Sequence, residues 1–446
     1  MRFDSFIEIL KYQANVRPEA PALKDHAKVL TFSMLYDAVL ERKDALKASG
    51  KTCLAVLTES TIPCVVEIFA ANAAGLQTVL LDPSLEDEVL AALLHRTDAD
   101  LLYADEEMQD LFAEDLIGHV DDGSDRILFF TSGTTDSSKA VVLTGKSLCA
   151  SAWNGSQMLP LQADDTLLCI LPLSHVFGFV CGLLWSLSCG ACTALGSGPR
   201  GIFTDFSRFR PTAVSVVPML LAYMLKAQVI NPELKTILIG AGDCPGELIE
   251  KAKSTGILVS FGYGLTETSS GIAISTGGDP YALSVCPDDR ITIAEDGEVL
   301  IEAPTCIMQG YYKDPSGTKA VLRDGVLRSG DLGYLDAEGK LHLTGRKKEM
   351  LVLSDGTKIF LPEYEGKITK VLGHNELAVD LINGRPVLIL ESEEPKEALL
   401  QRLQPLMETL PRGQQLSDLI IIHEPLPRTA TGKIKRWELR QKVGIE

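Results

Sequence analysis

Residues 127–143 read ILFFTSGTTDSSKAVVL, and this stretch decides how the rest of the chain is interpreted. The apolar run at 127–130 predicts a buried strand, small or polar residues follow at 131–138, and a second apolar run begins after Lys139. Small side chains let backbone N–H groups gather around an anion, hydroxyls donate further hydrogen bonds, and the lysine adds positive charge. The pattern therefore predicts a strand, a loop suited to an oligophosphate, and a second strand. A solvent-exposed Ser/Thr hairpin would have the same composition.

The loop is not a Walker A motif, because Gly133 is not followed five residues later by Gly-Lys-Ser/Thr. The overall composition is that of a well-packed globular protein, with 446 residues, 46% hydrophobic and 23% charged. This length predicts two or more domains. With 42 basic and 60 acidic residues, the net charge of −18 argues against nucleic acid or anionic membranes as partners held by bulk charge. If the protein binds an anion, it must do so through a local cluster of donors and not through its overall charge.

The sequence indicates a cytoplasmic protein. Asp4 and Glu8 interrupt the apolar residues at the N-terminus, so no secretory apolar segment forms there, and the ten cysteines are scattered without a disulfide framework. Between residues 167 and 200 no charged side chain occurs, but Pro172, His175 and several glycines interrupt the segment. We expect a core strand, a loop and a buried helix there, and no stable membrane span.

Strand and helix patterns alternate from residue 53 onward, which predicts an α/β fold with parallel sheets layered with helices. Residues 1–50 are expected to be helical. After Pro287 the pattern changes to short strands and turns, which predicts an antiparallel β subdomain. The last hundred residues resemble a separate small α+β unit. We therefore expect an N-terminal domain at 1–347 and a small mobile C-terminal domain at 348–446, with a hinge near Lys348.

Several short motifs have the chemistry of a nucleotide site. Gly262-Tyr263-Gly264 places an aromatic ring between two glycines, which would admit a planar base, and Glu267 beside the Thr266 hydroxyl could hold magnesium next to phosphates. Asp331 lies in a Gly-flanked turn, where a carboxylate could accept hydrogen bonds from ribose hydroxyls. Each motif alone is as compatible with an ordinary turn.

Taken together and in order, these motifs are more specific. TSGTTDSSKA (131–140), PLSHVFG (172–178), YGLTET (263–268), SGDLGYLD (329–336), GRKKEMLVLSDGTKI (345–359) and PRTATGKIKR (427–436) resemble the successive core motifs of the adenylate-forming superfamily of acyl-CoA ligases, luciferases and peptide-synthetase adenylation domains. The resemblance covers roughly residues 5 to 440. Within it, GYYKDP (310–315) and the segment from 345 look most like fatty-acyl-CoA ligases.

The resemblance implies an AMP-forming acid–thiol ligase. In this family a carboxylate attacks the α-phosphate of magnesium ATP to give an acyl-adenylate, and a thiol, usually that of coenzyme A, then displaces AMP. The implied catalytic residues are Lys433, which would bridge the carboxylate and the α-phosphate, Thr266 at the α-phosphate, and Glu267 as the magnesium ligand. His175 would wall the acyl pocket, although a histidine bonded within an apolar core is the alternative.

The resemblance also implies the nucleotide contacts. The β- and γ-phosphates would be held by Thr131, Ser132, Gly133, Thr134, Thr135 and Lys139. The adenine would be framed by Gly240, Ala241, Gly242, Gly262, Tyr263 and Gly264. Asp331 would take the ribose hydroxyls, and Arg346 would support the ribose or the phosphates.

The phosphate loop departs from the family pattern TSGTTGxPKG. Asp136 replaces a glycine, and a carboxylate near a polyphosphate should weaken its binding. Three functions remain open: a ligase that activates a fatty or other non-amino organic acid for CoA, a ligase that loads the phosphopantetheine thiol of an acyl carrier protein, and a catalytically impaired nucleotide- or acyl-binding relative. Luciferase-like oxygenation is a more remote fourth.

Overall fold

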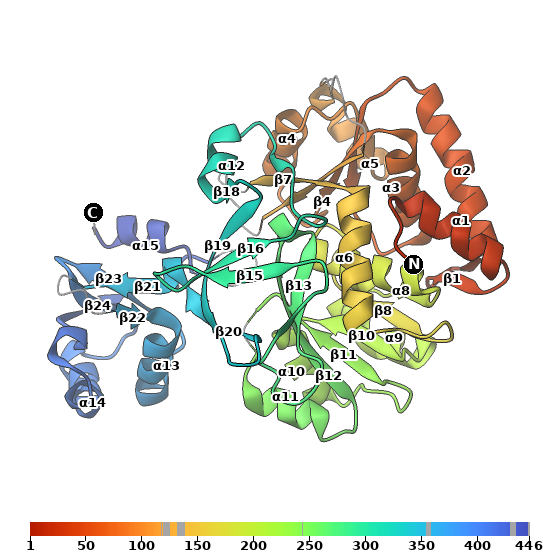
Figure 1. The fold of residues 1–446 in the computed structure, drawn as a ribbon. Helices are drawn as coiled ribbons and strands as arrows, with labels where there is room; N and C mark the ends of the chain where they lie inside the picture. Colours follow the sequence, from red (N-terminus) through yellow and green to blue (C-terminus); the bar gives the residue numbers. More distant parts are fainter. Residues whose placement is uncertain are drawn as a thin grey trace.

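Figure 1 shows the fold in a computed structural model, which describes residues 1–116, 118, 125–131, 139–242, 244–353, 358–428 and 434–444. The N-terminal part is built on two sheets in which parallel pairs predominate. The larger has the order β14 (Ser284–Val285), β13 (Ser270–Ile274), β12 (Leu258–Leu265), β11 (Thr236–Ile239), β10 (Ala213–Val216), β8 (Thr166–Cys169), β9 (Cys192–Leu195), β1 (Pro21–Lys24), β2 (Val29–Thr31). The other has the order β17 (Gly310–Tyr311), β7 (Ala140–Thr144), β6 (Arg126–Phe130), β4 (Gln77–Leu81), β3 (Cys53–Leu57), β5 (Leu101–Tyr103).

Helices connect the parallel strands, because a parallel pair requires a crossover connection. In the N-terminal part they are α1 (Phe6–Val16), α2 (Phe32–Ala48), α3 (Ile62–Ala74), α4 (Asp87–Arg96), α5 (Glu106–Leu111), α6 (Gly145–Met158), α7 (Val176–Phe179), α8 (Trp185–Cys189), α9 (Ile202–Phe209), α10 (Pro218–Ala227), α11 (Gly246–Lys253) and α12 (Pro315–Val321). A π-helical turn, Val180–Leu184, joins α7 to α8. Thr31 caps α2, since its side chain accepts a hydrogen bond from the backbone N–H of Met34.

A cluster of four buried phenylalanines joins β6 to the helices α1, α3 and α7. Phe129 of β6 packs against Phe179 of α7 with ring centroids 5.6 Å apart, and Phe6 of α1 lies 5.6 Å from the same ring. Phe69 of α3 completes the cluster at 4.8 Å from Phe6. All four side chains are fully buried. The strand that leads into the phosphate loop is thus held by the same core as the segment that carries His175.

The antiparallel sheet expected after Pro287 is present. It has the order β15 (Arg290–Ile293), β16 (Glu298–Glu302), β19 (Val326–Leu335), β18 (Leu322–Arg323), with β20 (Leu341–Arg346) paired to β19. The β15–β16 turn contains the expected Asp296-Gly297 pair, and Gly297 has φ +86°, which a residue without Cβ adopts readily.

The C-terminal elements gather at one side of the molecule, where Figure 1 shows them in blue. They are β21 (Met350–Val352), β22 (Lys358–Phe360), α13 (Leu361–Leu372), β23 (Leu377–Ile382), β24 (Arg385–Glu391), α14 (Lys396–Glu408), β25 (Asp418–Ile422) and α15 (Arg436–Lys442). One hydrophobic cluster draws its buried residues from 351 to 419 alone. Asn383 and Gly384 form the turn between β23 and β24, whereas the Asp355-Gly356 pair, whose sequence suggests a second such turn, lies outside the described residues.

Two expectations about local structure were wrong. Residues 1–50 are not all helical, because Pro21–Lys24 and Val29–Thr31 form a hairpin whose first strand pairs in parallel with β9. Strands this short have too little periodicity to be recognised without the sheet edge that they extend. The second concerns β12, which was expected to end in Gly262-Tyr263-Gly264 but continues one residue further, to Leu265, and pairs with β13.

The uncharged segment after residue 167 forms β8, a loop, the buried helical segment 176–189 and β9, as expected. Among the described residues, none of the helices combines the length and hydrophobicity that crossing a bilayer would need. All ten cysteines lie within the described ranges and are free thiols.

Candidate active site

The phosphate-loop stretch is framed by an antiparallel pair. β6 and β7 pair along their length, and beyond them the backbone N–H of Thr131 donates to the Lys139 carbonyl at 3.0 Å. The Lys139 N–H donates back to the Thr131 hydroxyl at 3.1 Å. The two flanking strands are confirmed. Ser132, Gly133, Thr134 and Thr135 lie outside the described residues, so their phosphate contacts stay predictions.

Lys139 and Glu267 are brought together by a residue that the sequence did not single out. The Tyr311 hydroxyl donates to Oε1 of Glu267 at 2.8 Å, and the Lys139 ammonium lies 4.1 Å from the centre of the same ring. Burial and the neighbouring carboxylate raise the pKa of Tyr311, so the hydroxyl stays protonated as a donor. Tyr311 reaches this position because β17 pairs with β7, the strand that follows Lys139.

The turn after Glu267 has an unusual backbone. Ser269 and Ser270 have φ of +53° and +104°, angles that are costly for residues with a Cβ. The Ser269 hydroxyl donates to the Cys306 carbonyl at 2.7 Å, and Met308 donates its N–H to the Glu267 carbonyl at 2.8 Å. These bonds hold the short 3₁₀ turn Thr266–Thr268, and with it the Glu267 carboxylate, against the segment that leads to Tyr311.

A second cluster forms around Asp331. The Tyr263 hydroxyl donates to Oδ2 of this carboxylate at 2.7 Å, and Nε of Arg346 lies 2.9 Å from Oδ1. The sequence predicted that Asp331 lies in a turn, and this was wrong. Asp331 lies inside β19, opposite Arg346 of β20 and next to an irregularity in the strand pairing. Gly330 before it has φ +73°. Burial, followed by the Asp331 charge, raises the pKa of Tyr263 and keeps its hydroxyl a donor.

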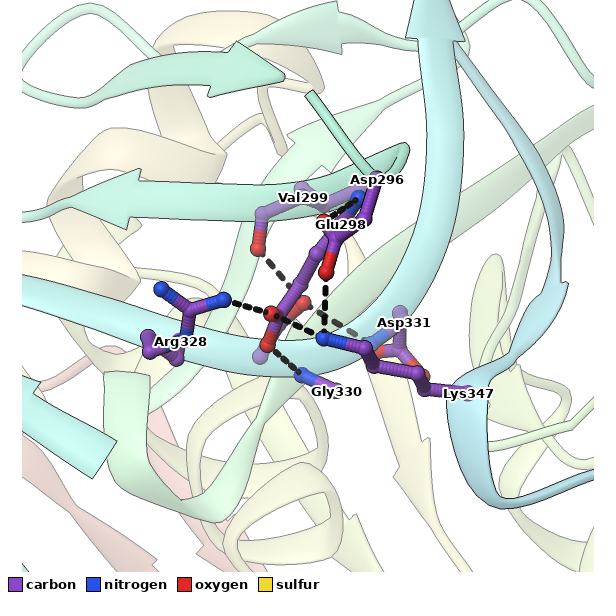
Figure 2. A network of polar contacts seen from close by, with 8 residues as sticks. Asp296, Glu298, Val299, Arg328, Gly330, Asp331 and Lys347 are labelled. Atoms are coloured by element: carbon purple, nitrogen blue, oxygen red, sulfur yellow. Dashed lines mark hydrogen bonds and ion pairs between the residues drawn. The ribbon is translucent and has the colours of Figure 1, made fainter. Parts of the chain in front are cut away.

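A buried carboxylate on the neighbouring strand supports Asp331. Figure 2 shows Arg328 and Lys347 approaching Glu298 from opposite sides, while the Gly330 N–H donates to it at 3.1 Å. Burial opposes ionisation of Glu298, but the Lys347, Gly330 and Arg328 donors outweigh it, so its pKa is lowered. Ser329 completes the network, because its hydroxyl donates to the Val299 carbonyl and accepts from the Asp331 N–H.

The predicted adenine frame lies where β11 ends beside β12, which continues past it. The two strands run in parallel with Ile239 opposite Phe261, so Gly240 and Gly262 emerge at the same edge. Ala241 has φ +62°, and a Cβ on Gly240 would come within 2.8 Å of the Phe177 ring. Gly264 is still more confined, since a Cβ there would overlap the Ser270 carbonyl oxygen at 1.6 Å. These glycines are needed for the packing of the site's own walls.

His175 lies at the start of α7 and is solvent-exposed. Partial burial of its ring lowers the pKa of the imidazole, and Asp82 acts in the opposite direction. A neutral imidazole at physiological pH suits a pocket wall better than an anion ligand. Its contact with an acyl group stays a prediction.

Two of the residues predicted from the sequence cannot be placed in the site. Lys433 falls in 429–433, outside the described ranges, and nothing is known of the Lys348 side chain. Among the residues that the structure describes, no group of three or more His, Cys, Asp or Glu side chains could hold a metal by itself. The Glu267 carboxylate fits a magnesium ion that phosphate oxygens also bind, because one carboxylate is enough protein ligand in such a site. The Tyr311 hydroxyl donates to Oε1 and so orients this carboxylate.

Comparison with known proteins shows what the chain is similar to. A family model described as "AMP-binding enzyme" matches residues 120–312, which carry the phosphate loop, Glu267 and Tyr311. The chain is 28% identical to 2-succinylbenzoate–CoA ligase of Listeria monocytogenes serotype 4b (strain F2365), over 97% of this chain and 98% of that protein. The chain is thus similar to adenylate-forming AMP-binding enzymes along almost its whole length.

Solved structures of this superfamily have the same fold along almost the whole chain. O-succinylbenzoate coenzyme A synthetase from Bacillus subtilis, in complex with AMP, superposes with a TM-score of 0.82 at 25% identity, covering 97% of this chain and 98% of that one. The anthranilate CoA ligase AuaEII, in complex with anthranoyl-AMP, has a TM-score of 0.80 at 22% identity and covers 99% and 97% of the two chains. The expected α/β fold with its antiparallel subdomain is confirmed.

Proposed function

We propose that this adenylate-forming enzyme is an AMP-forming acid–thiol ligase that activates a small carboxylic acid with ATP and magnesium and passes the acyl group to coenzyme A. The observation that carries the proposal is that β12 holds Tyr263 on the buried Asp331 carboxylate and, three residues later, begins the turn that presents Thr266 and Glu267. One strand therefore contacts the carboxylate proposed for the ribose, Asp331, and leads into the carboxylate proposed for magnesium, Glu267.

Each residue has a role that its position supports. Asp331 would accept the ribose hydroxyls, with Arg346 beside it for the ribose or phosphates. Thr266 would donate to the α-phosphate, and Lys139 would neutralise the outer phosphates. Bound magnesium would draw charge from the phosphate oxygens as the carboxylate oxygen approaches phosphorus. Tyr311 holds Glu267 in place before the nucleotide arrives, so no reorganisation of this carboxylate is needed.

We also propose that the C-terminal part from Lys348 onward moves as a unit between the two half-reactions. β20 ends at Arg346, Lys347 is tied to Glu298, and the following hydrophobic cluster belongs to residues 351–419 alone. A rotation at residue 348 would leave the Asp331 cluster intact. Lys433 would then serve acyl-adenylate formation and leave the site before the thiol enters.

The identity of the acid is less constrained. The relatives with matching length are named for 2-succinylbenzoate, an aromatic dicarboxylate, and these names do not support the fatty acid expected from the sequence. Transfer to a carrier-protein thiol and loss of activity through Asp136 are the alternatives that remain. Both share the nucleotide site.

Acid-dependent exchange of pyrophosphate into ATP tests the proposal, with a panel of aliphatic, aromatic and dicarboxylic acids. We expect exchange with at least one acid, and formation of its CoA thioester once coenzyme A is added. Asp331→Asn should lower exchange at least tenfold. Asp336→Asn is the matched control, because that carboxylate lies on the loop after the same strand and contacts only neighbours such as His342. No exchange with any acid would refute the ligase function, and thioester formation only on a carrier protein would replace the acceptor.

A further inference from the structure

Tyr311 contacts both of the charged side chains that would receive magnesium and the outer phosphates, and it does so through different atoms. The Lys139 ammonium lies 4.1 Å from the centre of its ring, whereas its hydroxyl donates to Oε1 of Glu267 at 2.8 Å. Among the residues that the structure describes, Lys139 and Glu267 form no ion pair with each other. One neutral side chain therefore holds two opposite charges that are not paired.

The tyrosine is fixed in this position by its backbone and by burial. Its N–H donates to the Thr318 hydroxyl of α12 at 2.8 Å, and the N–H of Tyr312 donates to the Ala140 carbonyl at 2.8 Å. Tyr311 is 8% exposed. A buried ring whose backbone is held on both sides has little freedom to turn away from the two charges.

The two contacts of Tyr311 strengthen each other. A phenol that donates to a carboxylate becomes more electron-rich, and an electron-rich ring attracts a cation more strongly to its face. Burial, followed by the Glu267 charge, raises the pKa of Tyr311, so its hydroxyl stays protonated. The residue thus offers each charge a neutral partner.

A second carboxylate lies within electrostatic range of Lys139 but is engaged elsewhere. Asp314 caps α12, where its Oδ1 accepts from the Gly317 N–H at 2.7 Å and from the Ser316 hydroxyl at 3.0 Å. These two bonds lower the pKa of Asp314, and the Lys139 charge makes a smaller contribution in the same direction. Glu267 is therefore the carboxylate whose pairing with Lys139 matters for the site.

A direct pair between Lys139 and Glu267 would compete with the nucleotide. Two unit charges at 4 Å attract each other about four times more strongly near a protein surface than in bulk water. Outer phosphates would then have to displace Glu267 from the lysine, and magnesium would have to displace Lys139 from the carboxylate. A ring face and a neutral hydroxyl are weaker partners than an opposite charge, so ligands replace them at lower cost.

Building on the proposed ligase function, we propose that Tyr311 is a positioning residue that keeps Lys139 and Glu267 apart, so that both charges remain available to magnesium ATP. Tyr311 does not itself contact the reacting atoms. Loss of the tyrosine lets the lysine and the glutamate pair, which lowers the affinity for magnesium ATP. The affinity for AMP, which has no outer phosphates, stays the same.

Two substitutions separate the contacts of Tyr311, and the next residue supplies the control. Tyr311→Phe removes the hydroxyl that holds Glu267, and Tyr311→Leu also removes the ring that holds Lys139. Tyr312→Phe is the matched control, because Tyr312 makes the same two kinds of contact with other partners. Its hydroxyl donates to Asp98 at 2.6 Å, and the Lys313 ammonium lies 5.4 Å from its ring centre.

Calorimetric titration of the full chain with magnesium ATP and, separately, with AMP measures the effect. Tyr311→Leu should raise Kd for magnesium ATP about tenfold, since an ion pair must now be broken first, and Tyr311→Phe about threefold. In both variants Kd for AMP should stay within about twofold of the parent value, which also shows that the nucleotide site is folded. Tyr312→Phe should bind both ligands like the parent protein.

A double substitution distinguishes this role from a merely structural one. Lys139→Met should weaken magnesium ATP binding about tenfold in the parent protein but less than about twofold in the Tyr311→Leu background, where Glu267 already occupies the lysine. A tyrosine that only packs against the site would give equal losses in the two backgrounds. Equal losses therefore overturn the inference.

The remaining outcomes separate this inference from the proposed function. Unchanged magnesium ATP affinity in Tyr311→Phe, or equal weakening of magnesium ATP and AMP in both Tyr311 variants, overturns the inference and leaves the ligase function standing. The expected binding results without pyrophosphate exchange for any acid overturn the ligase function alone. A parent protein that does not bind magnesium ATP overturns both.

Discussion

The Glu298→Gln substitution probes the network that supports Asp331, the carboxylate proposed to accept the ribose hydroxyls. The Glu298 side chain is 4% exposed and accepts from the Arg328 guanidinium, the Lys347 ammonium and the Gly330 N–H. Buried hydrogen bonds to charged groups contribute roughly 1.5–3 kcal/mol each, but Arg328 and Lys347 are 46% and 43% exposed, so water screens both contacts. We therefore expect the free energy of unfolding to fall by about 2 kcal/mol.

Urea unfolding and calorimetric titration with AMP measure the two effects of this change. The Gly330 N–H loses its anionic acceptor next to Asp331, so AMP affinity should fall several-fold together with stability. Because the pKa of Glu298 is lowered in the folded state, its stabilisation is present above about pH 4.5 and is lost as the pH falls through the folded-state pKa. The stability difference between parent and variant should thus shrink in acid.

Asp296→Asn is the control for this experiment. Asp296 contacts the same Lys347 ammonium, but its side chain is 46% exposed, so its loss should change stability by less than about 0.5 kcal/mol. If Glu298→Gln unfolds like Asp296→Asn and binds AMP like the parent protein, the buried network does not support the Asp331 strand, and our reasoning is wrong.

Three further predictions concern other groups. Burial, with the Asp288 charge, raises the pKa of Asp289 from 3.8 to about 7, so folding favours its protonated form, and stability should decline as the pH rises from about 4 to about 7 and level off above; Asp289→Asn should remove most of this decline in urea titrations, and parallel pH profiles would contradict it. Lys433→Ala should abolish pyrophosphate exchange but keep thioester formation from supplied acyl-adenylate, whereas equal loss of both reactions would remove its assigned role. Asp136→Gly should tighten ATP binding several-fold by calorimetry, and an unchanged or weaker affinity would show that this carboxylate does not oppose the phosphates.

Much of the fold follows from local patterns. The strands at 53–57 and 77–81 and the helix between them were predictable because each is apolar with the right period and ends at a capping residue or glycine. The π-helical turn at 180–184 was not predictable from local patterns; its Cys181 carbonyl accepts a hydrogen bond from the Ser215 hydroxyl, a partner more than thirty residues away in the chain. Tertiary contacts, not propensity, decide such segments.

The candidate site divides in the same way. Tyr263, Glu267 and Asp331 stand in motifs with a fixed order, so their types and spacing identified them. Tyr311 and Glu298 were not identified, although GYYKDP at 310–315 was noted, because their roles come from strand pairing: β17 with β7, and β16 with β19. A sequence motif indicates which side chains have reactive or ligand-binding groups. It does not indicate which side chains position those groups.

The two bonds to Asp331 have a consequence for how a nucleotide would be received. Tyr263 and Arg346 already hold both carboxylate oxygens, so the side chain has one rotamer before any ligand arrives. The side chain therefore loses its rotamer entropy when the protein folds and not when the nucleotide binds. An incoming ribose would share acceptors that are already desolvated and oriented. If Asp331 binds a ribose as proposed, its carboxylate is oriented for the sugar hydroxyls before the nucleotide arrives.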